Sequence, residues 1–192
     1  MKKRLIPLVI IGLLVFLIIS YNSIIPVRNA AEEQWANVES AYQRRADLIP
    51  NLENTVKSYA DFEKETLESV ISARAKATAT TIDPSNMTPE NMAAFQEAQS
   101  GLTGALSKLM LVVERYPDLK ANQNFLELQS QLEGTENRIN VERNRFNKAA
   151  TNYRNRIETF PTNLLASAFG FKVMPLFESA DGAEVAPVIS RD

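Results

Sequence analysis

The fold is decided by residues 122–159, which read NQNFLELQSQLEGTENRINVERNRFNKAATNYRNRIET. Apolar or small side chains recur along this stretch at intervals of three and four residues. The series is Phe125, Leu128, Leu132, Thr135, Ile139, Phe146, Ala149, Tyr153 and, just beyond the stretch, Phe160. Only Glu142 and Arg156 interrupt it. Such a sustained repeat is typical of a helix that packs against other helices along its whole length, so we expect one long helix from Asn122 to Thr159.

The same spacing predicts three further helices before this one. The first runs from Pro26 to about Arg45, the second from Pro50 towards Thr81, and the third from Pro89 to Tyr116. Proline-containing turns are expected between them at 47–51, 81–88 and 116–120, with Thr88 as the N-cap of the third helix. The predicted fold is all-α: an N-terminal transmembrane helix followed by an antiparallel up-and-down four-helix bundle. Because the fourth helix is nearly twice as long as the first, either Pro26 lets the bundle tilt or the fourth helix breaks, and we expect the tilt.

An apolar segment precedes the bundle. Leu5 to Ile19 follows the basic residues Lys2, Lys3 and Arg4, and with the residues up to Ile25 it reaches the roughly 17–25 residues that span a bilayer. A cleaved signal peptide is the alternative, but Arg28 lies where a peptidase requires a small residue. Basic residues beside a span stay cytoplasmic, so a single-pass inner-membrane protein with its body outside the cytoplasm is predicted.

The chain therefore divides into three predicted parts. Residues 1–25 form the anchor, residues 26–162 form the bundle, and residues 163–192 form a tail that is apolar up to Phe177 and disordered from Ser179 onwards.

The composition excludes many kinds of enzyme. The chain has no histidine and no cysteine, so thiol nucleophiles, Ser-His triads and His or Cys zinc sites are excluded. The net charge of -2 gives no basic field for nucleic-acid binding. We therefore predict a non-enzymatic protein without cofactor or metal, and no catalytic residue is assigned. The weak alternative is a metal-dependent hydrolase that uses carboxylates alone, from Glu63, Glu65, Glu68, Glu136 and Glu142.

Short motifs distributed over nearly the whole chain resemble those of the LemA family. They are Tyr21-Asn22, Arg44-Arg45-x-Asp47-Leu48-Ile49-Pro50-Asn51-Leu52, Tyr59-Ala60, Val70-x-x-Ala73-Arg74, Tyr116-Pro117-x-Leu119-Lys120-Ala121, Thr135-Glu136-x-x-Ile139-x-x-x-Arg143-x-x-Phe146-Asn147 and Ile157-x-x-Phe160-Pro161. The resemblance implies a bacterial protein with an N-terminal membrane helix and an antiparallel helical bundle, and it assigns no catalytic residue.

The chain departs from the family pattern at two places, and the family's described orientation differs from ours. Phe62-Glu63 stands where the family has His-Glu, and Tyr153 is followed by Arg154 where the family has asparagine. Descriptions of the family place a short N-terminus outside the cell, opposite to the orientation that Lys2, Lys3 and Arg4 predict.

Two surfaces are candidates for function. The expected turns bring together charged residues at the distal tip, either as ion pairs that close the bundle or as a docking site for an envelope protein: Arg44, Arg45, Asp47, Asp118 and Lys120. Self-association of the chain stays open.

At the membrane end, the basic fourth helix and the apolar tail either cover the open end of the bundle or contact lipid. The candidate lipid-facing residues are Arg154, Arg156, Phe169, Phe171 and Phe177. The alternative function is thus a lipid-binding module that shapes the membrane. Arg74 and Glu142 fall on or near apolar seams, so each is expected to make a buried or half-buried polar contact that fixes helix register.

Overall fold

The computed structural model describes residues 2–59 and 62–178. Within these residues every element is helical. The elements are α1 (Lys2–Lys57), α2 (Lys64–Ala79), the short 3-10 helix η1 (Pro84–Asn86), α3 (Pro89–Val113), α4 (Pro117–Lys120), α5 (Gln123–Glu158) and α6 (Thr162–Ala168). The all-α prediction is confirmed.

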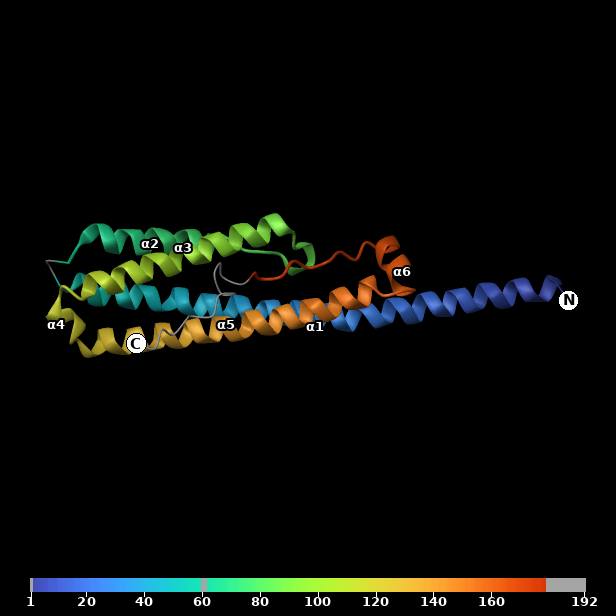
Figure 1. The fold of residues 1–192 in the computed structure, drawn as a ribbon, viewed down its shortest axis with the longest axis horizontal. Coiled ribbons are helices and arrows are strands. Elements are labelled where there is room, and N and C mark those ends of the chain that lie inside the picture. Colours follow the sequence, from blue (N-terminus) through green and yellow to red (C-terminus); the bar gives the residue numbers. More distant parts are fainter. Residues whose placement is uncertain (1, 60–61, 179–192) are drawn as a thin grey trace, which may run out of the picture.

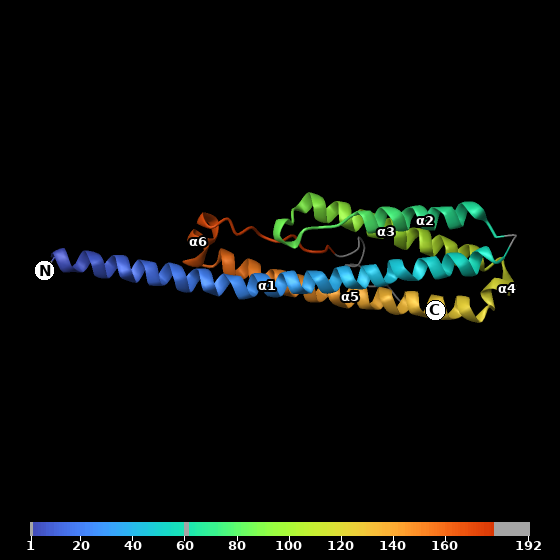
Figure 2. The same ribbon diagram turned by 180° about the vertical axis from the view of Figure 1, so that it is seen from behind.

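The helices form an elongated antiparallel bundle. α1 and α5 lie side by side over most of the molecule, and the α2–α3 hairpin covers their distal half (Figures 1 and 2). The N-terminal part of α1 projects beyond every other element (Figure 1). α4 and the α1–α2 connection lie together at the opposite end, which we call the distal tip.

The predicted turn at 47–51 is wrong, because α1 continues through Pro50 to Lys57. Proline inside a helix removes one hydrogen bond and costs about 3 kcal/mol. The turn of helix around it buries Ile49, Leu52 and Val56 in the core, and this burial offsets that cost. The chain reverses instead between Lys57 and Lys64.

Arg74 supplies a donor that Pro50 lacks. A residue at position 50 would normally donate its N–H to the carbonyl of Ala46, four residues earlier. Proline has no N–H, and the Arg74 Nε of α2 donates to that carbonyl at 2.8 Å. The prediction of a half-buried polar contact at Arg74 is confirmed.

The longer α1 also removes the reason for a tilt at Pro26. Beyond Pro26, α1 extends for about 46 Å at 1.5 Å per residue, close to the roughly 54 Å of α5. Both Pro26 and Pro7 lie inside the same continuous helix. The two long helices therefore match in length without a break.

The limits of α3 and α5 agree well with the sequence, whereas α2 begins at Lys64 and not at Pro50 as predicted, because α1 continues to Lys57. α5 begins after Asn122, whose side chain accepts the N–H of Phe125, and α3 begins after Thr88, which forms a capping box with Asn91. α3 ends three residues before the expected Tyr116. On the α5 seam, Glu142 is buried as expected, but its ion pairs with Arg138 and Arg145 lie within α5 and do not fix the register between helices. Phe160 was wrongly assigned to the seam and is 75% exposed.

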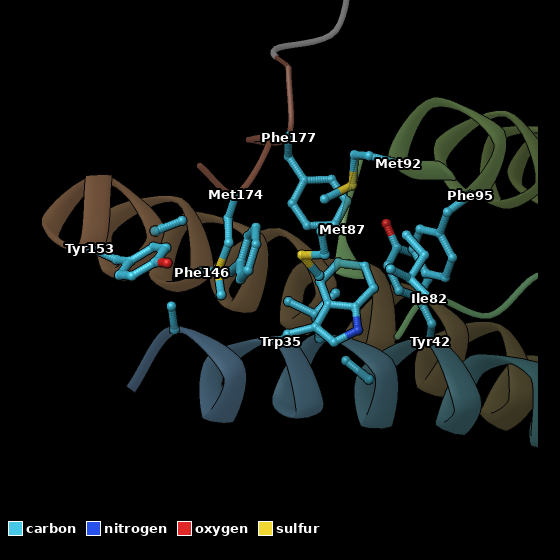
Figure 3. Close-up of a cluster of buried hydrophobic side chains, with 14 of the residues drawn as sticks. Trp35, Tyr42, Ile82, Met87, Met92, Phe95, Phe146, Tyr153, Met174 and Phe177 are labelled. Carbon is cyan, nitrogen blue, oxygen red and sulfur yellow. The ribbon is translucent and has the colours of Figure 1, made fainter. Parts of the chain in front are cut away.

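The core consists of two clusters. The distal cluster joins α1, α2, α3 and α5 around Leu52, Leu102 and Phe125. The proximal cluster lies around Trp35 and Phe146 at the end of the α2–α3 hairpin, and Met92 and Phe95 of α3 belong to it. The tail packs beside the end of the hairpin: Met174 and Phe177 enter the proximal cluster, and Phe177 stacks on Trp35 with ring centroids 5.8 Å apart (Figure 3). The tail up to Phe177 therefore covers the bundle. The predicted disorder from Ser179 to Asp192 lies outside the described residues.

Candidate functional site

The predicted distal-tip cluster is not assembled. Asp118 and Lys120 lie in α4 at the tip, but Arg45 lies on α1 about 18 Å before Lys57, at 1.5 Å per residue. Its neighbours Arg44 and Asp47 are exposed at the same level of the shaft, by which we mean the part of the bundle between the N-terminal anchor and the distal tip. The cause is the continuity of α1, which moves the chain reversal to residues 58–63.

Arg45 instead joins three helices in the middle of the bundle. Its side chain is 2% exposed, and its Nη1 donates to Glu136 Oε2 of α5 and to Thr103 Oγ1 of α3, both at 2.8 Å. Its Nη2 donates to Gln99 Oε1 at 2.9 Å, and Gln99 in turn donates to the Ala77 carbonyl of α2. We call Arg45, Gln99, Thr103 and Glu136 the polar layer.

The polar layer separates the two core clusters. On α1 the proximal cluster ends at Tyr42 and the distal cluster begins at Ile49, and on α5 the corresponding residues are Ile139 and Leu132. A buried arginine is tolerated only with hydrogen-bonding partners. Thr103 and Glu136 supply them from α3 and α5, so the polar layer links α1 to both of these helices.

A small cleft of about 220 Å³ opens beside the polar layer. Besides the layer residues it is lined by Tyr42 and Arg143, among others. The Arg45 guanidinium lies 5.2 Å from the centre of the Tyr42 ring. Burial raises the pKa of Tyr42, and the charges of Arg143 and Arg45 oppose that rise. The residues present here include no nucleophile paired with a general base.

The distal tip combines aromatic rings with charged side chains. Asn122 donates to the Tyr59 hydroxyl at 3.0 Å, and the rings of Phe62 and Tyr116 lie 5.0 Å apart. Ion pairs join Arg115 with Glu63 and Lys120 with Glu114. Two leucines within two turns of the tip are exposed, Leu111 of α3 and Leu126 of α5.

At the membrane end, the lipid-facing candidates have different environments. Phe177 is buried in the proximal cluster, so its assignment to lipid is wrong. Phe171 is half-buried, and Phe169 is 52% exposed, and both rings contact Tyr21 of α1. Arg156 is exposed and donates to Ser23 Oγ at 3.1 Å, whereas Arg154 is half-buried.

The residues that hold the tail were not predicted. The side-chain amide of Asn147 accepts the N–H of Phe177 and donates to its carbonyl, both at 2.9 Å. The Arg143 guanidinium lies 4.7 Å above the Phe177 ring and donates to the Glu178 carbonyl. The available signal was an asparagine beside the seam residue Phe146, which suits pairing with an irregular backbone.

The carboxylates proposed for a hydrolase are dispersed. Glu63 pairs with Arg115 at the tip, Glu136 with Arg45 in the polar layer, and Glu142 with Arg138 and Arg145 on α5. Within residues 2–59 and 62–178, no group of three acidic side chains is arranged to hold a metal ion.

In the same residues, α1 is the one helix long and apolar enough to cross a membrane. Its apolar part before Ser20 is mostly exposed, with large side chains such as Leu8, Ile11 and Ile19 turned outwards. A helix that is hydrophobic all round without burying its side chains is typical of a membrane span, which supports an N-terminal anchor.

Comparison with known proteins gives the family. The chain is 24% identical to Protein LemA of Metamycoplasma hominis over 160 residues, which are 83% of this chain and 69% of that protein. It is 25% identical to Magnetosome protein MamQ 2 of Paramagnetospirillum magneticum and to Magnetosome protein MamQ of Magnetospirillum gryphiswaldense. Each of these matches covers 94% of this chain and 72% of the relative. None of these names states an enzymatic activity. The LemA family model matches residues 34–190, and the chain belongs to the LemA family.

Proposed function

We propose that the chain is a single-pass, membrane-anchored module without enzymatic activity, which presents its distal tip to another protein of the bacterial cell envelope. The observation that carries this proposal is the continuity of α1 from the apolar N-terminal segment to the tip. A single helix from Ser20 to Lys57 holds the tip about 55 Å from the end of the exposed apolar segment.

The chemistry of the tip suits protein recognition. Exposed leucines at 111 and 126 lie near charged residues of α3 and α4, among them Asp118 and Lys120. Exposed apolar side chains among polar ones are a common feature of interaction sites. Histidine and cysteine are absent, so the commonest catalytic groups are missing from the chain.

The test is photo-crosslinking in intact cells. A photo-reactive amino acid replaces Leu111 or Lys120 at the tip, and Glu133, which is exposed on the shaft of α5, serves as the matched control. We expect a discrete adduct with another envelope protein from the tip positions and none from Glu133. Arg45 is unsuitable as a test position because it is buried.

Two results would contradict the proposal. Adducts formed only with a second copy of the chain would show that the tip mediates self-association and does not bind another envelope protein. Equal labelling of many proteins from the tip and the shaft would show that the tip has no specific partner.

A lipid-binding module is the second candidate function. Phe177 no longer supports it, but exposed apolar residues remain at the membrane end of the bundle.

A further inference from the structure

The apolar part of α1 that precedes the bundle is too short to cross a bilayer. Leu5 to Ile19 is about 22 Å long at 1.5 Å per residue, whereas the hydrocarbon core is about 30 Å thick. If the basic residues up to Arg4 mark one face, the span must extend to about Ile24 or Ile25. The last turn or more of the span therefore belongs to a part of α1 that the bundle already contacts.

Several contacts join the body to this last part of the span. Ser20 and Ile24 are buried against other elements, and Arg156 of α5 donates to Ser23 Oγ. The Tyr21 ring lies 5.3 Å from Phe169. α6 lies beside α1 at the same level (Figures 1 and 2). The bundle thus cannot stand clear of a membrane that α1 crosses.

The part of the body at this level is apolar and exposed. We define the α6 corner as Phe160, Leu164 and Phe169, whose side chains are 75%, 64% and 52% exposed. Phe160 and Phe169 flank α6, and Leu164 lies within it. Three large apolar side chains exposed next to a membrane span are costly in water and favourable in lipid.

Basic and aromatic residues adjoin the α6 corner. Lys172 and Arg28 line a cleft of about 280 Å³ together with Tyr21 and Phe169. Tyrosine and basic side chains are characteristic of the headgroup level of a bilayer, where a basic residue contributes roughly 1 kcal/mol with anionic lipids. Along α1, Arg28 lies about 10 Å beyond Tyr21 on the side away from the anchor, so this basic residue follows the apolar corner.

We propose that the α6 corner is a second membrane contact, in which Phe160, Leu164 and Phe169 enter the leaflet on the side of the bundle. The corner supplies exposed apolar side chains beside the last part of the span, which the bundle contacts, and it fixes the bundle against the membrane surface beside its own anchor. This inference rests on the membrane anchor of the proposed function and specifies how the body meets the lipid.

Spin labels test the contact in the full-length chain. The chain has no cysteine, so Leu164→Cys, Phe169→Cys and Phe160→Cys each carry one label in bilayers of phosphatidylcholine and phosphatidylglycerol. Leu14→Cys reports on the anchor, and Leu111→Cys, equally apolar but 73% exposed near the tip, is the matched control. Helical circular dichroism confirms that each variant is folded.

We expect the ratio of oxygen to water-soluble nickel accessibility at the α6 corner to resemble that at Leu14→Cys. It should exceed the ratio at Leu111→Cys by about threefold or more, since oxygen concentrates in hydrocarbon and the nickel complex does not. If the nickel complex reaches the labels at the α6 corner while the label at Leu14→Cys stays in lipid, the inference is overturned and the anchor is left intact. Nickel access at Leu14→Cys as well would refute the anchor. Shielding of the corner from both reagents would show that protein covers it, which also overturns the inference.

Discussion

At the scale of single residues, Arg45 shows both what the sequence reveals and what it hides. The buried face of α1 reads Val38, Tyr42, Arg45, Ile49 and Leu52, so the 3-4 spacing places the arginine among core residues. Its burial was therefore predictable from the spacing. Its partners were not, because Gln99 and Glu136 are distant in sequence and meet Arg45 only after three helices have packed.

The polar layer predicts unequal costs for neighbouring arginines. Arg45→Ala should lower the free energy of unfolding by about 3 kcal/mol, because it leaves Glu136 and Gln99 without their buried partner. Glu136→Gln should cost less, about 1 kcal/mol, since Glu136 is partly exposed. Arg44→Ala, on the exposed side of the same helix, should change the value by less than about 0.5 kcal/mol. Urea unfolding of the full chain in detergent measures all three, and equal effects of the two arginine variants would contradict this role.

Glu39, beside Trp35 of the proximal cluster, predicts a pH-dependent change in stability. Burial raises the pKa of its carboxyl above the ordinary 4.5, and the indole N–H of Trp35 opposes the rise. A raised pKa in the folded state favours folding at low pH, and this contribution is lost as the pH rises through the folded pKa. Glu39→Gln should therefore raise the melting temperature slightly at pH 7 and leave it unchanged well below pH 4.5.

Thermal melts over a pH series measure this difference. Glu33→Gln, at an exposed position of the same helix, is the control and should change little. A larger gain from Glu39→Gln at low pH than at pH 7 would show that the sign is wrong.

At the scale of elements, α1 shows how a strong local signal was overridden. Asp47-Leu48-Ile49-Pro50-Asn51 has the composition of a turn, and proline favours a helix start. The apolar spacing on the core face continues through it without a break, and tertiary burial decides the outcome. Helices α3 and α5 were predictable because the capping residues and the apolar spacing indicate the same helix limits.

The pairing of Arg74 with the carbonyl that Pro50 leaves open predicts a coupling. Arg74→Met should lower the free energy of unfolding by about 1 kcal/mol in the natural chain. In a Pro50→Ala background the loss should be clearly smaller, since an alanine at position 50 donates its own N–H to Ala46. A double-mutant cycle by urea unfolding measures this, and equal losses in both backgrounds would show that Arg74 acts through other contacts.

At the scale of the whole molecule, the anchor, the shaft and the tip form one continuous unit. The sequence predicted the bundle and the anchor, because each rests on a long periodic or apolar segment. It could not predict that Phe177 packs beside the end of the α2–α3 hairpin in the proximal cluster, since this depends on relative helix lengths in space. The same lengths bring Phe169 of the α6 corner against Tyr21 of α1, where we propose that the bundle meets the lipid.

The central claim is that α1 crosses the membrane and that the helical bundle lies on the side away from the cytoplasm. Single-cysteine variants Ser85→Cys and Ser72→Cys place a thiol at exposed positions of the body in a chain that otherwise has none. In intact cells, treated with a membrane-impermeant maleimide, we expect both to be labelled before lysis. Labelling only after lysis would place the body in the cytoplasm and contradict the account.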